Sequence, residues 1–116
     1  MKALVIVLNI DDYLEDILTI LANNKVKGAT IIDSQGMGSA IVNNEISSIP
    51  LFSSLKMLLS ERHPRNKTIF SVIHNDDILN NVVAEIQALL RKDHHQGIGF
   101  MFTVPVDNIF LIKNGN

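Results

Sequence analysis

Glycine-rich stretches are the part of this sequence best suited to binding chemistry. Three of them occur, Gly28-Ala29-Thr30, Gly36-Met37-Gly38 and Gly97-Ile98-Gly99. One such pair alone favours a flexible turn, but backbone N–H groups from several glycine-rich turns can form a concavity that binds an anion. A dinucleotide fingerprint would need a glycine at position 41, which is isoleucine, and no Gly-Lys-Ser/Thr run occurs. We therefore expect a ligand site built largely from main chain, with a hydroxyl from Thr30.

Side chains suited to catalysis or metal binding are sparse. Asp11-Asp12 and Asp76-Asp77 each precede a helical pattern, so helix capping is the favoured interpretation of these carboxylates. His94 and His95 could bind a metal, although they could equally cap a helix C terminus, and no HxH or HExxH spacing occurs. No serine or threonine has a recognisable His-Asp partner. We therefore expect that the protein is not an enzyme.

The elements that must position these residues occur twice. β-Rich runs at residues 4–8 and 29–33 flank the first Asp-Asp pair and a helical pattern, and runs at 68–73 and 100–104 flank the second. The apolar positions of the two helical faces are Leu14, Ile17, Leu18 and Leu21, and then Leu79, Val82, Val83, Ile86 and Leu90. Two βαβ units predict an α+β, ferredoxin-like sandwich over a single domain 1–116, with a four-stranded antiparallel sheet and both helices on one face. Residues 109–112 form a further short strand-like run.

A long excursion, residues 35–67, separates the two units. Pro50 and the leucines at 51, 55, 58 and 59 predict a short extra helix, which Pro64 would end. Such a helix either packs on the sheet or a neighbour, or orders when it binds a partner. A small basic cluster follows it, namely Arg62, His63, Arg65 and Lys67.

Composition narrows the class of partner. The net charge of −2 argues against binding to nucleic acid or to an anionic membrane, and the absence of cysteine excludes disulfides. The apolar run at residues 3–8 is too short to span a membrane, so we expect a soluble, cytoplasmic protein. Because this run is apolar at almost every position, it suits burial on both faces of the sheet. Two helices cover only one face, so we expect a homo-oligomer to cover the other.

This layout resembles the P-II nitrogen-regulatory signal-transduction family over nearly the whole chain. The resemblance is carried by the βαβ-βαβ order, the three glycine-rich stretches and Ile112-Lys113-Asn114-Gly115. It implies a homotrimer that binds ATP or ADP, often with 2-oxoglutarate, in clefts between subunits. It also implies a regulated partner protein, contacted through the family's T-loop, which residues 35–67 would match. The positions that match nucleotide contacts are Gly28, Ala29, Thr30, Gly36, Gly38, Gly97, Gly99 and Lys113.

The chain departs from the family pattern where phosphates are bound. Ser39-Ala40-Ile41-Val42 replaces the usual Arg-Gln-Lys-Gly, Phe100 or Met101 replaces a B-loop lysine, and Lys113 alone remains of an Arg-x-Arg pair. Each charge-assisted contact contributes about 1.5–3 kcal/mol, so we expect weak ATP binding unless the basic cluster substitutes. The only tyrosine is Tyr13, which precludes uridylylation of a T-loop tyrosine.

Two alternatives stay open beside a small-molecule sensor in nitrogen metabolism. A metal-binding trimer resembling the divalent-cation tolerance proteins would use His94 and His95. A ligand-free assembly module would use the extra helix only to complete the trimer.

Overall fold

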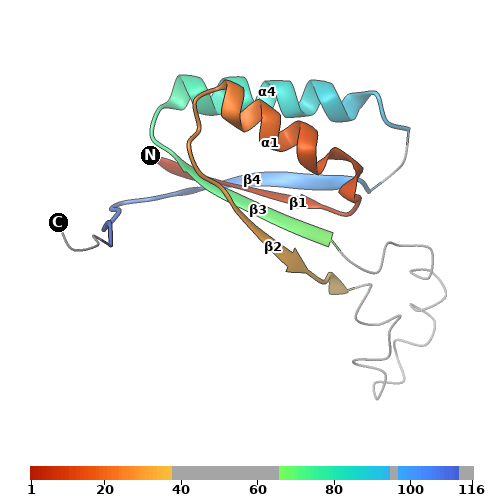
Figure 1. The fold of residues 1–116 in the computed structure, drawn as a ribbon, viewed down its shortest axis with the longest axis horizontal. Coiled ribbons are helices and arrows are strands. Elements are labelled where there is room, and N and C mark those ends of the chain that lie inside the picture. Colours follow the sequence, from red (N-terminus) through yellow and green to blue (C-terminus); the bar gives the residue numbers. More distant parts are fainter. Residues whose placement is uncertain (38–65, 95–96, 113–116) are drawn as a thin grey trace, which may run out of the picture.

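Two helices pack on one face of a four-stranded sheet (Figure 1). The computed structural model describes residues 1–37, 66–94 and 97–112. Its elements are β1 (Lys2–Leu8), the 3-10 turn η1 (Asp11–Tyr13), α1 (Leu14–Asn23), β2 (Thr30–Ser34), β3 (Asn66–Ile73), α4 (Asp76–Arg91) and β4 (Gly99–Pro105). The strands are antiparallel in the order β2-β3-β1-β4. The predicted α+β, ferredoxin-like fold is therefore confirmed.

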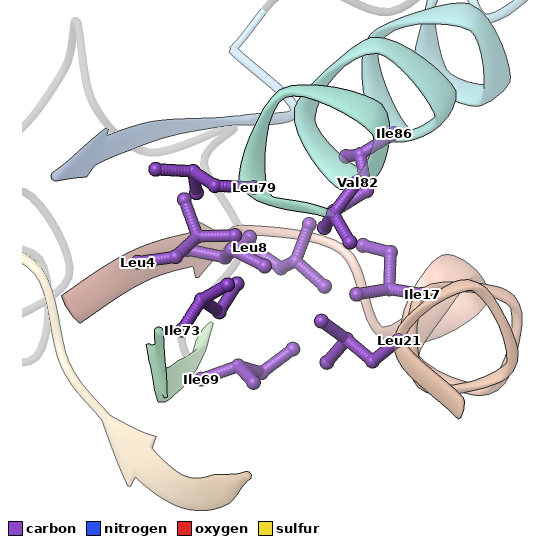
Figure 2. Close-up of a cluster of buried hydrophobic side chains, with 10 residues drawn as sticks. Leu4, Leu8, Ile17, Leu21, Ile69, Ile73, Leu79, Val82 and Ile86 are labelled. Carbon is purple, nitrogen blue, oxygen red and sulfur yellow. The ribbon is translucent and has the colours of Figure 1, made fainter. Parts of the chain in front are cut away.

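The hydrophobic core lies between the sheet and the two helices. Alternate residues of β1 and β3 face the helices, because successive side chains of a strand point to opposite faces. Figure 2 shows these side chains meeting those that recur every three or four residues along α1 and α4. The buried set is Leu4, Ile6, Leu8, Ile17, Leu21, Ile69, Ile73, Leu79, Val82 and Ile86. Both predicted helical faces thus form the core, and burial of each such side chain contributes about 1.5–3 kcal/mol.

The helices begin differently from the sequence prediction. Asp11 and Asp12 lie in η1, and α1 begins at Leu14 without a side-chain cap, so the predicted capping role of this pair is wrong. Asn75 caps α4, since its Oδ1 accepts hydrogen bonds from the N–H groups of residues 77 and 78 at 2.7 and 3.1 Å. Asp76-Asp77 instead occupies the first turn of α4, where carboxylates are favoured by the helix dipole.

The C-terminal run forms no strand. Residues 106–112 leave β4 in an irregular conformation, and the N–H of Val106 donates to the carbonyl of Met1 at 3.1 Å. Beyond this anchor the chain extends away from the sheet (Figure 1). Ile112 is 97% exposed, so the predicted strand at 109–112 is wrong for the isolated chain. The predicted helix at 51–59 lies outside the described residues.

The sheet face opposite the helices is apolar and exposed, and we call it the open face. Val5 of β1 stands directly between Phe70 of β3 and Phe102 of β4. Phe70 and Phe102 are 37% and 45% exposed, and the ring centroids of Phe100 and Phe102 lie 6.1 Å apart. The apolar residues of the open face are Ala3, Val5, Val7, Ile32, Phe70, Val72, Phe100, Phe102 and Val104. Contiguous apolar surface of this kind marks a binding interface in soluble proteins.

Candidate functional site

Four chain segments meet at one end of the sheet, which we call the loop end. Residues 34–36 leave β2 there, Asn66 begins β3, Asn9 follows β1, and the glycine turn (residues 97–99) leads into β4. The register aligns them, because Ser34 pairs with Asn66, and Leu8 pairs with Lys67 on one side and Gly99 on the other. Gly36 and the glycine turn therefore lie at the same end of the sheet.

An asparagine bridge connects these segments across the loop end. Asn9 Nδ2 donates to the carbonyl of Gly97 at 2.6 Å, and Asn9 Oδ1 accepts from Asn66 Nδ2 at 3.3 Å. Asn66 Oδ1 in turn accepts a hydrogen bond from the Ser34 hydroxyl, which lies 2.8 Å from that of Thr68. Side chains thus link the glycine turn beside β4 to both ends of the 35–67 excursion.

Two glycines of the turn are required for different reasons. Gly97 has a φ of +69°, in the left-handed region that side-chain-bearing residues rarely adopt. A Cβ at Gly99 would lie 2.1 Å from the carbonyl oxygen of Val7, because β4 approaches β1 closely at this point. At Gly36, a Cβ would meet only Asn66 Nδ2 at 3.6 Å, which is ordinary contact.

The remaining predicted residues do not join the loop end within one chain. Thr30 pairs with Phe70 near the other end of β2, about 13 Å from Ser34 at 3.3 Å per residue. Gly28 and Ala29 precede it, and the Gly28 carbonyl accepts a hydrogen bond from the buried hydroxyl of Ser71 at 2.5 Å. The structure thus places Gly28-Ala29-Thr30 apart from the glycine turn. Gly38 and Lys113 lie outside the described residues.

Charged groups near the loop end are paired. The Lys67 ammonium forms an ion pair with the Asp33 carboxylate, one residue away from the asparagine bridge. The other members of the predicted basic cluster lie outside the described residues.

Tyr13 donates a hydrogen bond to Asp93, which follows α4. This hydrogen bond, together with partial desolvation and the Asp93 charge, raises the pKa of Tyr13 above its ordinary value of 10.0. This contact connects the start of α1 to Asp93, in the segment that leads from α4 to the glycine turn.

A metal centre has no support within residues 1–37, 66–94 and 97–112. No group of three His, Asp or Glu side chains there could hold an ion. His94 is exposed, and His95 lies outside the described residues.

A cleft of about 790 Å³ lies between α4 and β4, on the helix-covered side of the sheet. Ile6, Val83 and Leu90 give it an apolar lining, to which Arg91 and Asp93 add charge. Ile98 and Gly99 also line this cleft, so it adjoins the glycine turn from the helix side. The asparagine bridge lies on the opposite side of the sheet from this cleft. Along β3, Ile69 faces the core, and successive residues point to opposite faces, so Asn66 and Thr68 lie on the side of the open face.

The asparagine bridge was not predicted from the sequence. Asn9 directly follows a β-rich run and Asn66 precedes another by two positions, and a polar residue near a buried strand was the available indication. Their partners are distant in sequence, with Asn9 and Gly97 separated by 88 positions. The pattern alone therefore could not pair them.

Comparison with known proteins gives one result across the whole chain. The model of the family described as "Nitrogen regulatory protein P-II" matches residues 1–116. A comparison with curated protein sequences finds no match. Among the described residues, no helix is long and apolar enough to cross a membrane.

Proposed function

Because this chain belongs to the nitrogen regulatory protein P-II family, we propose that it is a trimeric sensor that binds an adenine nucleotide between its subunits. The 35–67 excursion then offers a surface to a regulated partner protein, and the ligand selects among its arrangements. The sensor acts in the cytoplasm, possesses no catalytic activity and responds to nitrogen metabolism. The family match supports the regulatory role.

The open face supports the trimer. Phe70 of β3 and Phe100 and Phe102 of β4 lie on either side of β1 and are partly exposed, although each ring would stabilise the protein by about 1.5–3 kcal/mol if it were buried. Sister subunits that cover this face remove the apolar surface from water. In a closed cyclic assembly every subunit presents the same face to its neighbours, so no copy of the open face remains uncovered.

The separation of the glycine-rich stretches is the observation that carries the nucleotide site. The glycine turn and Gly36 lie at the loop end, whereas Gly28-Ala29-Thr30 lies about 13 Å along β2. One chain therefore presents two incomplete halves of the predicted site. A trimer brings the loop end of one subunit towards the Gly28–Thr30 stretch of the next, and the cleft between them holds the nucleotide.

The charge at the loop end sets the expected preference among nucleotides. In the described part of the chain, the cation nearest the asparagine bridge is Lys67, which pairs with Asp33. Backbone N–H groups can hold one phosphate, but additional phosphates need additional cations. We therefore expect ATP to bind no more tightly than AMP.

Native mass spectrometry and calorimetry test this proposal together. The purified protein should appear as a trimer and bind ATP, ADP, AMP or a cyclic nucleotide at submillimolar concentration. Phe102→Glu should yield monomers, because it places a charge on the open face, whereas Thr103→Glu on the other face of β4 should remain trimeric. A monomeric wild type would exclude the intersubunit cleft, and a trimer that binds none of these compounds at millimolar concentration would exclude a nucleotide sensor.

A further inference from the structure

We propose that Asn9 is a positioning residue, which orients the backbone donors of the glycine turn and couples this turn to both ends of the 35–67 excursion. The inference deepens the proposed function, because it names the side chain that would hold the nucleotide-binding turn in its active geometry. Asn9 itself contacts no ligand in this proposal, and it acts through the residues that it binds.

Asn9 donates hydrogen bonds to two successive carbonyl groups of the turn. Its backbone N–H donates to the carbonyl of Ile98 at 2.7 Å, and its side-chain Nδ2 donates to that of Gly97 at 2.6 Å. The described peptide bonds are trans, so the C=O and N–H of each peptide point in opposite directions. The N–H groups of Ile98 and Gly99 therefore both point away from Asn9.

These two N–H groups are placed to bind an acceptor. Among the described strands, β4 lies at the edge of the sheet and pairs with β1 alone, so the N–H of Gly99 points out of the sheet rather than towards another described strand. Two successive N–H groups on one side of a turn form an anion-binding arrangement. Because Gly97 occupies the flexible left-handed region, the turn needs an external contact to keep this orientation, and Asn9 supplies it.

The same side chain connects the turn to the excursion through hydrogen bonds. Asn9 Oδ1 accepts from Asn66 Nδ2 at 3.3 Å, and Asn66 binds the Ser34 hydroxyl. Ser34 ends β2 directly before the excursion, and Asn66, the second-last residue of the excursion, begins β3. A displacement of the turn by a bound ligand thus reaches both of these residues through one carboxamide.

A carboxamide suits both parts of this role, because its nitrogen donates while its oxygen accepts. Asn9→Asp retains the oxygen that accepts from Asn66 but loses the donor to Gly97. Asn9→Leu has a similar size and loses both contacts. The two variants therefore separate positioning of the turn from coupling to the excursion.

Amide exchange and side-chain NMR on the full chain test the assignment. Exchange of the backbone N–H of residue 9, which is protected by Ile98, should become about tenfold faster in both variants, as expected when one hydrogen bond that holds the turn is lost. The side-chain amide resonance of Asn66 should shift in Asn9→Leu and remain near its wild-type position in Asn9→Asp. A merely structural role for Asn9 would not produce this difference between the variants.

Asn24→Leu is the matched control. Asn24 Nδ2 donates to the carbonyl of Ile20 at 2.8 Å beyond the end of α1, so this variant loses a carboxamide outside the site. It should leave both NMR signals and the affinity for AMP unchanged, whereas both Asn9 variants should lower that affinity about tenfold. Should Asn9→Leu fail to fold, Asn66→Asp tests the same link, because it still accepts from Ser34 but cannot donate to Asn9.

The outcomes separate this inference from the proposed function. If the Asn9 variants match the Asn24→Leu control both in the exchange rate of the residue 9 N–H and in the resonance position of the Asn66 side-chain amide, Asn9 does not position the turn. Unchanged AMP affinity in both Asn9 variants would likewise overturn its role at the ligand. If the wild type binds no nucleotide while the NMR differences appear, the nucleotide sensor fails and the positioning role of Asn9 stands.

Discussion

Replacing Gly99 with alanine tests the close approach of β4 to β1 at the candidate site. The added Cβ would lie 2.1 Å from the Val7 carbonyl oxygen and 3.2 Å from Leu8 Cα. Both neighbours are backbone atoms, so no side chain can rotate away. Relief to an ordinary contact of at least 3.4 Å requires that the strands separate by about 1.3 Å, beyond what interstrand hydrogen bonds tolerate.

The expected destabilisation is about 1–4 kcal/mol. Overpacking of this kind costs about 1–3 kcal/mol. The 2.7 Å bond from the Asn9 N–H to the Ile98 carbonyl would stretch past 3.5 Å, which adds about 0.5–1.5 kcal/mol. Reduced freedom of the unfolded chain offsets about 0.4–1 kcal/mol of this loss.

Two other glycines provide matched controls for the same substitution. Gly28→Ala should be neutral or slightly stabilising, since nothing lies within 4 Å of its added Cβ and its φ is not positive. Gly97→Ala should cost about 1–2 kcal/mol through its φ of +69° alone, because its surroundings are open. Urea unfolding followed by circular dichroism at one protein concentration measures all three free energies. A Gly99→Ala protein as stable as Gly28→Ala would refute the reasoning.

Three further predictions address the core, a helix cap and an ionisable contact. Ile86→Ala should lower the free energy of unfolding by about 2–5 kcal/mol because the side chain is fully buried, whereas Gln87→Ala beside it should have little effect in the same urea assay. Asn75→Ala should cost about 1 kcal/mol through loss of two hydrogen bonds at the start of α4, and an equal loss in the exposed control Asn80→Ala would contradict that cap. The folded-state pKa of Tyr13 lies above 10.0, so the stability from its contact with Asp93 is complete below pH 10 and is lost as pH rises through that pKa. Tyrosinate absorbance should show this midpoint directly, and Asp93→Asn should lower it; an unchanged midpoint would exclude Asp93 as the cause.

Part of the fold and the site could be predicted because it depends on neighbouring residues. Apolar residues spaced for a helix or a strand must face the core wherever the element packs, so Ile17, Leu21, Val82 and Ile86 were identified as core positions. The glycine pairs were recognised for a similar reason, since glycine tolerates backbone geometry that other residues avoid. The φ of Gly97 and the crowding at Gly99 agree with that expectation.

Other features depend on contacts between residues that are remote in sequence. The capping prediction for Asp12 failed because this residue lies within η1, so that Tyr13 occupies the position before α1. The strand predicted at 109–112 failed because this run has no partner strand among the described residues. The asparagine bridge arises only when the register places the ends of all four strands at one edge, bringing Asn9 to Asn66 and Gly97. Periodicity can assign a residue to a face of its own element, but a contact between elements depends on how the whole sheet aligns them.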